Sequence, residues 1–202
     1  DRNFLKIFNT KCHVIENGVF IEQFQRSNTP KLVSRLVFVG NLDYGPNKQA
    51  VEFIIKNLYE RLPDFTFYVI GNGCERLEEL YRNRGNLIFT GYVASLRTYF
   101  DGGSIFISPI FSGTGLQNKI LDAFAHKVPV IASSSSIAGI KCLPNVHYLP
   151  ANSADEFVYS IEMLAASHKR QQELVCNASD LINKKYDWDI VSQKYKEFII
   201  DK

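Results

Sequence analysis

The chain has 202 residues, of which 46% are hydrophobic, 13% aromatic and 22% charged. This composition is typical of a globular protein with a sizeable core and argues against disorder or a fibrous repeat. The 23 Lys and Arg residues are interspersed with 21 Asp and Glu residues, so no nucleic-acid-binding stripe is visible and we expect no nucleic-acid partner. The longest nearly apolar stretch, residues 104–111, is far below the roughly 20 residues that a spanning helix requires.

Residues 1–32 do not fit the pattern of the rest of the chain, and their polar end around 23–30 is typical of a connector. We expect them to be an interdomain connector or the remnant of a preceding domain. The chain begins with Asp1 and its one methionine is Met163, which favours an excised piece of a longer protein. The four cysteines are far apart and lack metal-ligand spacing, so the sequence predicts free thiols and no metal site.

From residue 33 onward, short β-branched and aromatic runs alternate with helical patterns, as in successive βαβ units. The pattern predicts one α/β domain over residues 33–202, a doubly wound, Rossmann-like parallel sheet with helices on both faces. Its six expected strands cover residues 35–39, 66–70, 87–90, 104–108, 129–132 and 146–149.

Apolar residues recur at spacings of three and four in the intervening segments, for example from Val51 to Leu58 and from Leu116 to Phe124. After the last strand the pattern is helical throughout. It opens with Ser153 and Glu156 at capping-box spacing, and a final helix begins near residues 187–189. The sequence therefore predicts a helical extension at the carboxyl end.

In such a sheet, ligands bind beyond the carboxyl ends of the strands where the strand order reverses, between the first and fourth strands. The loops that leave these strands are residues 40–46 and 109–115. Gly113, Thr114 and Gly115 run into a helix that carries Lys119 and Asp122, so unpaired amides and the helix dipole favour a phosphate there. The alternative is a tight turn followed by a solvated ion pair.

The second and third strands end in the loops 71–74 and 91–93, at the same edge. These loops are expected to hold a base, although Asn-Gly sequences are also ordinary turns. Residues 133–136 are interpreted as a polar loop, and the four histidines as structural or exposed. No Ser, His and Asp grouping can be proposed, so the catalytic residues are unknown.

Several ordered segments resemble the carboxyl-terminal, donor-binding half of a GT-B glycosyltransferase of the family four (group 1) type. The string from Gly113 to Ala125, followed by Pro-Val-Ile-Ala at 129–132, is the most specific match. Residues 14–19 resemble the family's interdomain segment, and 36–40 resemble its first strand. Residues 89–93 and 186–188 also fall where the family has similar sequences.

The resemblance implies transfer of a hexosyl unit from a nucleotide diphosphate sugar to a glycan or lipid-linked acceptor, without a cofactor or metal ion. The diphosphate would face residues that surround the two glycine-containing loops: Gly40, Asn41, Gly113, Thr114, Gly115 and Lys119. Asp122 would take the place of a ribose-binding Glu. The base would lie against Gly71, Tyr92 and Val93.

A GT-B enzyme needs two such domains, so the resemblance places the catalytic and acceptor-binding groups in an absent amino-terminal half, and we expect this chain alone to be inactive. It also implies a cytoplasmic protein, peripheral to the inner face of the plasma membrane. This chain departs from the family at Asn41, Pro46 and Phe111, where relatives carry cationic residues. These departures motivate one alternative, a non-catalytic nucleotide-binding or interaction module. A further alternative, half of a nucleotide-sugar 2-epimerase, shares the architecture but ranks last, because no suitable His lies in the strand-end loops.

Overall fold

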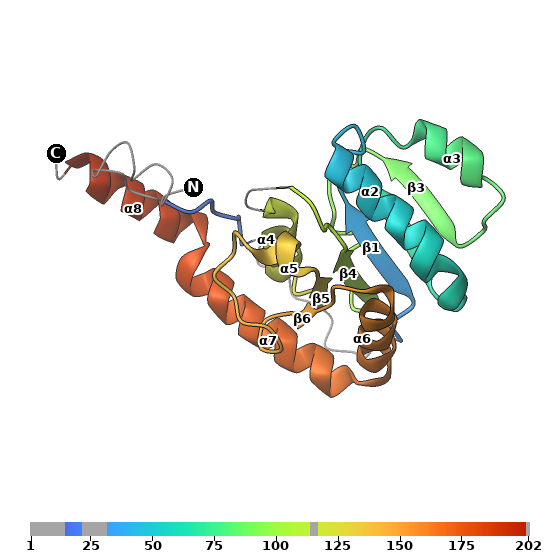
Figure 1. Cartoon of the computed structure of the whole chain (residues 1–202). Helices are drawn as coiled ribbons and strands as arrows, with labels where there is room; N and C mark the ends of the chain where they lie inside the picture. Colours follow the sequence, from blue (N-terminus) through green and yellow to red (C-terminus); the bar gives the residue numbers. More distant parts are fainter. Residues whose placement is uncertain (1–14, 22–31, 114–116, 201–202) are drawn as a thin grey trace.

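A computed structural model describes residues 15–21, 32–113 and 117–200 of the chain. Six parallel strands form one sheet in the order β3-β2-β1-β4-β5-β6 (Figure 1). This is the predicted doubly wound order, which reverses between β1 and β4. The strands are β1 (Arg35–Val39), β2 (Thr66–Ile70), β3 (Leu87–Gly91), β4 (Ser104–Ser108), β5 (Val130–Ala132) and β6 (Leu149–Pro150).

Helices cover both faces of the sheet, as predicted, and residues of β1 alternate between the two resulting cores. Leu36 and Phe38 pack in a cluster with residues of α2 and α6, whereas Val37 packs in a second cluster with residues of α4 and α7. The helices are α2 (Gly45–Phe53), α3 (Glu75–Tyr81), α4 (Asn118–Ala125), α5 (Ser134–Ile137), α6 (Ala154–Ala166), α7 (His168–Lys185) and α8 (Trp188–Ile200). A π turn (Ile54–Leu58) and a 3-10 turn (Tyr59–Arg61) extend α2.

Two predicted segments differ from the structure. The sixth strand is two residues long and begins only at Leu149, because residues 143–147 form a turn in which the His147 amide donates to the Leu143 carbonyl. Residues 134–137 form the short helix α5 rather than a loop. The Ser133 hydroxyl accepts from the Ser136 amide and so caps that helix.

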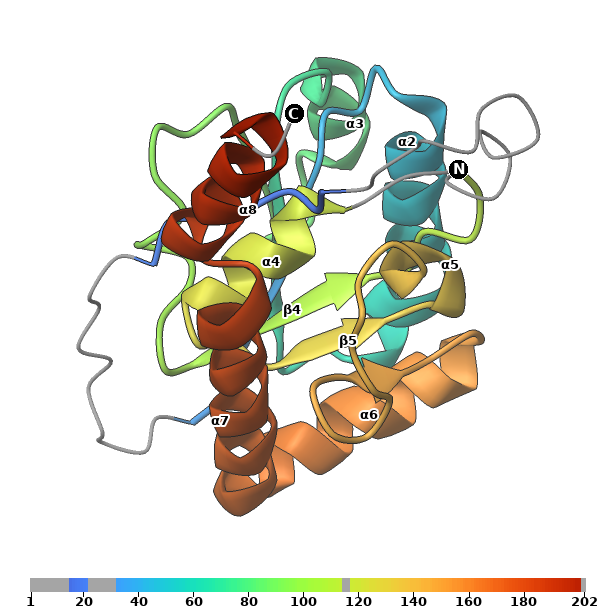
Figure 2. The ribbon, with the colours of Figure 1, turned by 90° about the vertical axis from the view of Figure 1, so that its left-hand side faces the viewer.

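Residues 15–21 lie against the junction of α7 and α8 (Figure 2). The Val19 amide donates to the Tyr186 carbonyl at 2.7 Å, and the Trp188 amide donates to the Val19 carbonyl at 3.2 Å. A Cβ on Gly18 would lie 2.7 Å from the Trp188 indole. This segment is therefore packed onto the domain, and the boundary at residue 32 stays a prediction.

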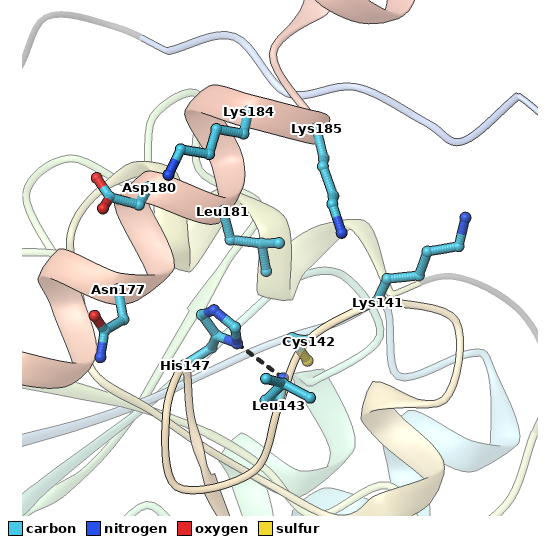
Figure 3. A pocket seen from close by; sticks show the side chains of 9 residues that line it. All are labelled: Lys141, Cys142, Leu143, His147, Asn177, Asp180, Leu181, Lys184 and Lys185. Atoms are coloured by element: carbon cyan, nitrogen blue, oxygen red, sulfur yellow. Dashed lines mark hydrogen bonds between the residues drawn. The ribbon is translucent and has the colours of Figure 1, made fainter.

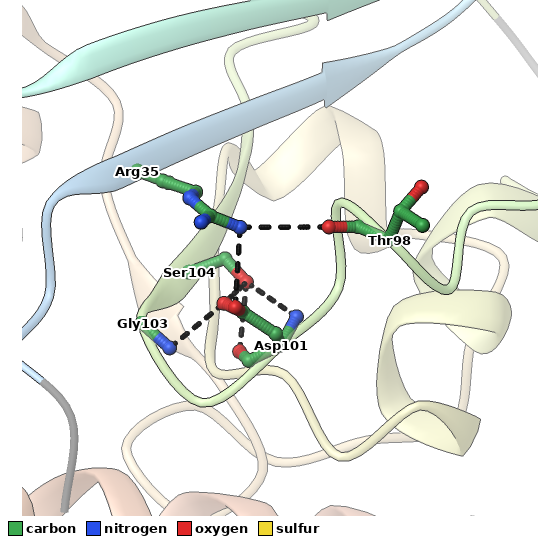
Figure 4. A network of polar contacts seen from close by, with 5 residues as sticks. All are labelled: Arg35, Thr98, Asp101, Gly103 and Ser104. Carbon is green, nitrogen blue, oxygen red and sulfur yellow. Dashed lines mark hydrogen bonds and ion pairs between the residues drawn. The ribbon is translucent and has the colours of Figure 1, made fainter.

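A polar network joins the amino-terminal ends of β1 and β4 (Figure 4). Arg35 pairs with Asp101 at 3.1 Å, and the Asp101 carboxylate accepts from the Gly103 amide at 2.9 Å. The Ser104 hydroxyl donates to the Asp101 carbonyl at 2.8 Å. These contacts hold the strand starts together and leave the carboxyl ends to form a site. No helix among the described segments is long and apolar enough to cross a membrane.

Candidate functional site

The loops that follow β1 and β4 lie side by side beyond the carboxyl ends of these strands. The Ser112 hydroxyl donates to the Gln49 amide oxygen at 2.9 Å. A Cβ on Gly113 would lie 3.2 Å from the Tyr44 hydroxyl oxygen and 3.3 Å from Pro46 Cγ. The structure thus brings the two predicted loops together at the point where strand order reverses.

Gly113 has a φ of +108°, a conformation that glycine adopts readily and other residues rarely adopt. Helix α4 begins at Asn118, whose amide oxygen accepts from the Asn17 side chain at 2.9 Å. Thr114 and Gly115, two predicted diphosphate contacts, lie outside the described residues. The structure describes Gly113 before this gap, and Gln117 and the residues of α4 after it.

Lys119 is held beside the first loop by Asn47 of α2. Its ammonium group donates to the Asn47 side-chain oxygen at 2.8 Å and lies 5.4 Å from the centre of the Phe38 ring. Asn47 in turn donates to the Asn41 carbonyl at 2.8 Å. Burial lowers the pKa of Lys119 to about 8 because the surroundings disfavour the charged form. The site therefore holds a desolvated cation against the first loop.

The sequence prediction missed Asn47, which is only 6% exposed. A signal was present in the sequence, because Asn47 lies three and four residues before Ala50 and Val51, on the buried stripe of α2. A polar residue at such a position must find hydrogen-bond partners in the interior. Here those partners are Lys119 and the Asn41 carbonyl.

Gly40 and Gly71 let the backbone and Asn47 approach one another closely. A Cβ on Gly40 would lie 2.7 Å from Asn47 Cγ, so this glycine makes room for the amide. Gly71 has a φ of +140°, and a Cβ there would lie 2.2 Å from the Gly40 carbonyl oxygen. Both glycines are therefore required by packing at this edge, whatever ligand they meet.

Asp122 lies one turn after Lys119 on α4 and is half-buried. Burial raises the pKa of its carboxyl group, and the neighbouring His126 partly opposes that effect. Neither Lys119 nor Asp122 is the fully solvated ion that the alternative interpretation required. Both side chains lie in surroundings that disfavour charge.

The predicted base-binding residues lie around the ends of β2 and β3. The Gly71 amide donates to the Gly91 carbonyl at 2.9 Å, which joins the two loops. Tyr92 is 75% exposed, whereas Val93 is partly buried against the core cluster around α4. An exposed tyrosine ring beside a backbone turn offers a surface on which an aromatic base can stack.

The three departures from the family pattern have local structural explanations. Pro46 occupies the first turn of α2, where a missing amide hydrogen costs nothing. The Asn41 side chain accepts from the Asp43 amide at 3.0 Å and so shapes the loop. Phe111 packs edge-on against Phe53, with 4.9 Å between ring centres. The position where relatives carry an arginine therefore belongs to an aromatic cluster here.

Among the residues described by the structure, no three His, Cys, Asp or Glu side chains are grouped so as to hold a metal ion. The cysteines within this part of the chain, Cys74, Cys142 and Cys176, are free thiols.

The strand order, the convergent glycine-containing loops and the helix that carries Lys119 define a Rossmann-like half of a GT-B fold. The chain belongs to the group 1 glycosyl transferases, whose family model matches residues 33–167. A relative in Klebsiella pneumoniae, described as an uncharacterized 44.6 kDa protein in the cps region, is 27% identical over 164 residues. That match covers 75% of this chain and 42% of the relative, so the chain spans less than half of its length.

Solved structures share the fold at low sequence identity. TarM of S. aureus has a TM-score of 0.76 and 14% identity, with 96% of this chain and 41% of TarM covered. HepE of Anabaena, solved in complex with UDP-glucose, has a TM-score of 0.72 and 14% identity, with 84% and 49% covered. The carboxyl-terminal domain of LpcC, a group 1 family protein of Francisella tularensis, has a TM-score of 0.64 and 19% identity. There 85% of this chain matches the whole of the crystallised domain.

Proposed function

We propose that this chain is the donor-binding half of a glycosyltransferase that moves a hexosyl unit from a nucleotide diphosphate sugar to a glycan or lipid-linked acceptor. The observation that carries the proposal is Lys119, a desolvated cation that Asn47 holds beside the loop that follows β1. Membership of the group 1 family and the likeness to HepE, solved with UDP-glucose, support it.

The diphosphate lies against the two loops, in contact with the backbone of Gly40, Asn41 and Gly113 and with the Lys119 ammonium group. Thr114 and Gly115, which follow Gly113 in the sequence, also contact the diphosphate. When the bond to the sugar breaks, the leaving nucleotide diphosphate gains negative charge. Fixed amides and a lysine already in place stabilise that charge, so the contribution of this half to catalysis is electrostatic.

The nucleoside lies along the same edge of the sheet. The Asp122 carboxylate accepts from the ribose hydroxyls, and the base rests on Gly71, Val93 and the exposed ring of Tyr92. Binding needs no metal ion and no cofactor. The acceptor and the groups nearest the reacting carbon belong to a second domain, so this chain alone transfers no sugar. The complete enzyme acts in the cytoplasm, at the inner face of the plasma membrane.

The test is an NMR titration of the chain with UDP, GDP and ADP, repeated on Lys119→Ala and on Lys169→Ala. Lys169 is an exposed lysine at the start of α7 and serves as the matched charge control. Saturable binding of one nucleotide, weakened about tenfold or more by Lys119→Ala alone, is the expected result for loss of a charged contact. Absence of binding by all three nucleotides, or equal weakening by both variants, would overturn the proposal.

The packing of Phe111 against Phe53 favours one alternative, a module that keeps the fold without chemistry. This alternative expects no nucleotide affinity, because a partly exposed aromatic contact stands where relatives carry an arginine. The same titration separates the two functions. Turnover by this chain with a donor and any acceptor would contradict the placement of the catalytic groups in another domain.

A further inference from the structure

A pocket lies between the carboxyl-terminal half of α7 and the loop that precedes β6 (Figure 3). Its volume is about 590 Å³, within the range of small-molecule sites. Leu143, Leu181 and Cys142 contribute its apolar surface. Polar and charged side chains make up the rest of the lining: Lys141, His147, Asn177, Asp180, Lys184 and Lys185.

The charge balance of this lining is positive, with three lysines against one aspartate. Lys141 is already paired with Glu16. Within the part of the chain that the structure describes, no ion pair engages Lys184 or Lys185, and Figure 3 shows the Lys185 side chain extending over the pocket. The negative end of the α7 dipole favours lysines in this last turn, but it does not account for the position of the Lys185 side chain over a cavity.

The loop that forms one wall of the pocket is held in place by hydrogen bonds before any ligand binds. The His147 Nδ1 atom accepts from the Leu143 amide at 2.8 Å, so the neutral ring carries its hydrogen on Nε2 and presents a donor. The Asn177 side chain donates to the Val146 carbonyl at 3.1 Å, and Arg170 donates to the Asn145 carbonyl at 2.6 Å. These contacts hold the loop against α7, so binding requires little ordering of the backbone.

The electrostatic field at His147 is consistent with an anion site. Burial lowers the pKa of His147, and the positive charge of Lys185 lowers it further. Asp180 is the acidic residue of the pocket lining, with its carboxylate directed away from His147 in Figure 3, and Lys184 and Lys141 add positive charge. A ligand anion placed between the imidazole and the lysines would offset this repulsion.

We propose that this pocket binds a phosphate monoester group, with Lys184, Lys185 and the His147 Nε2 hydrogen as its donors and Leu143 and Leu181 in contact with the apolar part of the ligand. Lysine ammonium groups are strong partners for a phosphate dianion. The group belongs either to a phosphorylated small molecule or to a lipid headgroup. The pocket lining shares no residue with the donor site at Lys119, and the proposal does not depend on the proposed function.

The test measures the pKa of His147 and the amide shifts of Leu143 and His147 by NMR, with inorganic phosphate as the probe and chloride at equal ionic strength as the reference. Phosphate is expected to move both amides and to raise the pKa of His147 by about half a pH unit, since a nearby unit charge acts through a high dielectric. The Lys184→Ala, Lys185→Ala double variant removes two exposed side chains and leaves the core intact. It is expected to lose about tenfold in phosphate affinity.

A Lys169→Ala, Lys196→Ala double variant carries the same charge change elsewhere and is expected to respond as the wild type does. Vesicles of phosphatidylcholine with and without phosphatidic acid distinguish the source of the phosphate. Sedimentation of the chain with phosphatidic acid alone, lost in the Lys184, Lys185 variant, assigns a headgroup. A response to free phosphate without sedimentation assigns a soluble ligand. If neither probe moves His147, or the pocket variant binds as tightly as the control variant, the proposal is overturned.

Discussion

Lys119 gives the donor-site proposal a pH signature. Its pKa is lowered from 10.5 to about 8 by burial in the free protein. A diphosphate beside the ammonium group favours the charged form and raises that pKa again. Nucleotide binding above about pH 8 is therefore coupled to proton uptake, and affinity must fall as the pH rises.

The size of this effect follows from the two protonation states. With a pKa of about 8, the free lysine is roughly 90% charged at about pH 7 and 10% charged at about pH 9. If the bound lysine stays protonated throughout, the nucleotide affinity falls roughly ninefold over this interval. A nucleotide diphosphate sugar is the suitable probe, because its diphosphate group does not titrate in this range.

Calorimetric titrations at the two pH values, in buffers of different ionisation enthalpy, measure both the affinity and the proton uptake. Lys119→Arg is the matched control, since a guanidinium group remains charged throughout and predicts a flat profile. A wild-type affinity that does not change with pH, or a Lys119→Arg variant with the same pH dependence as the wild type, would refute the role assigned to this lysine.

The same pKa predicts the opposite pH dependence for the stability of the protein without nucleotide. Its free energy of unfolding, measured in urea, is expected to rise by at most about 3 kcal/mol as the pH increases from about 8 to 10.5. The Lys119→Met variant is expected to show no such rise. Asn47→Leu leaves the Lys119 ammonium group and the Asn41 carbonyl without their partner, and is expected to lower the free energy of unfolding by about 2–4 kcal/mol in the same assay. Gly71→Ala adds a Cβ in a strained conformation against the Gly40 carbonyl, with an expected loss of about 3 kcal/mol, measured as a lower thermal midpoint. Nucleotide titrations in EDTA and in Mg²⁺ are expected to yield the same Kd, and loss of binding in EDTA would contradict a metal-free site.

The sheet was predictable because its strands are short β-branched runs separated by helical periodicity, and those signals are local. The sequence also predicted that the carboxyl ends of β1 and β4 lie together, because the doubly wound topology determines where the strand order reverses. The sixth strand was misplaced because its limits depend on the turn around His147, which combines a local Leu143–His147 bond with contacts from Arg170 and Asn177 of α7, later in the chain. The pattern of apolar residues predicts which positions lie in the core, but it does not predict polar contacts between segments that are far apart in the sequence.

The role of Asn47 illustrates the same limit within the site. Its position on a buried stripe was readable, but the identity of its partner was not, because Lys119 lies 72 residues later and meets it only through the fold. Phe111 is the converse case. A mismatch with the family pattern was visible in the sequence, whereas its packing against Phe53 became evident only in the structure.

Lys119 and Asp122 share one property that bears on what the site binds. Burial favours the neutral form of each group, so it lowers the pKa of the lysine and raises the pKa of the aspartate. Without a nucleotide, the site therefore carries two poorly solvated charges on one helix. Either charge could be replaced by an apolar residue at a gain in stability if packing were its sole purpose. A nucleotide diphosphate supplies an anion to the lysine and hydroxyl donors to the aspartate, and so compensates both groups at once. Binding should therefore raise the free energy of unfolding, and Asp122→Asn should raise the stability of the free chain while it weakens nucleotide affinity.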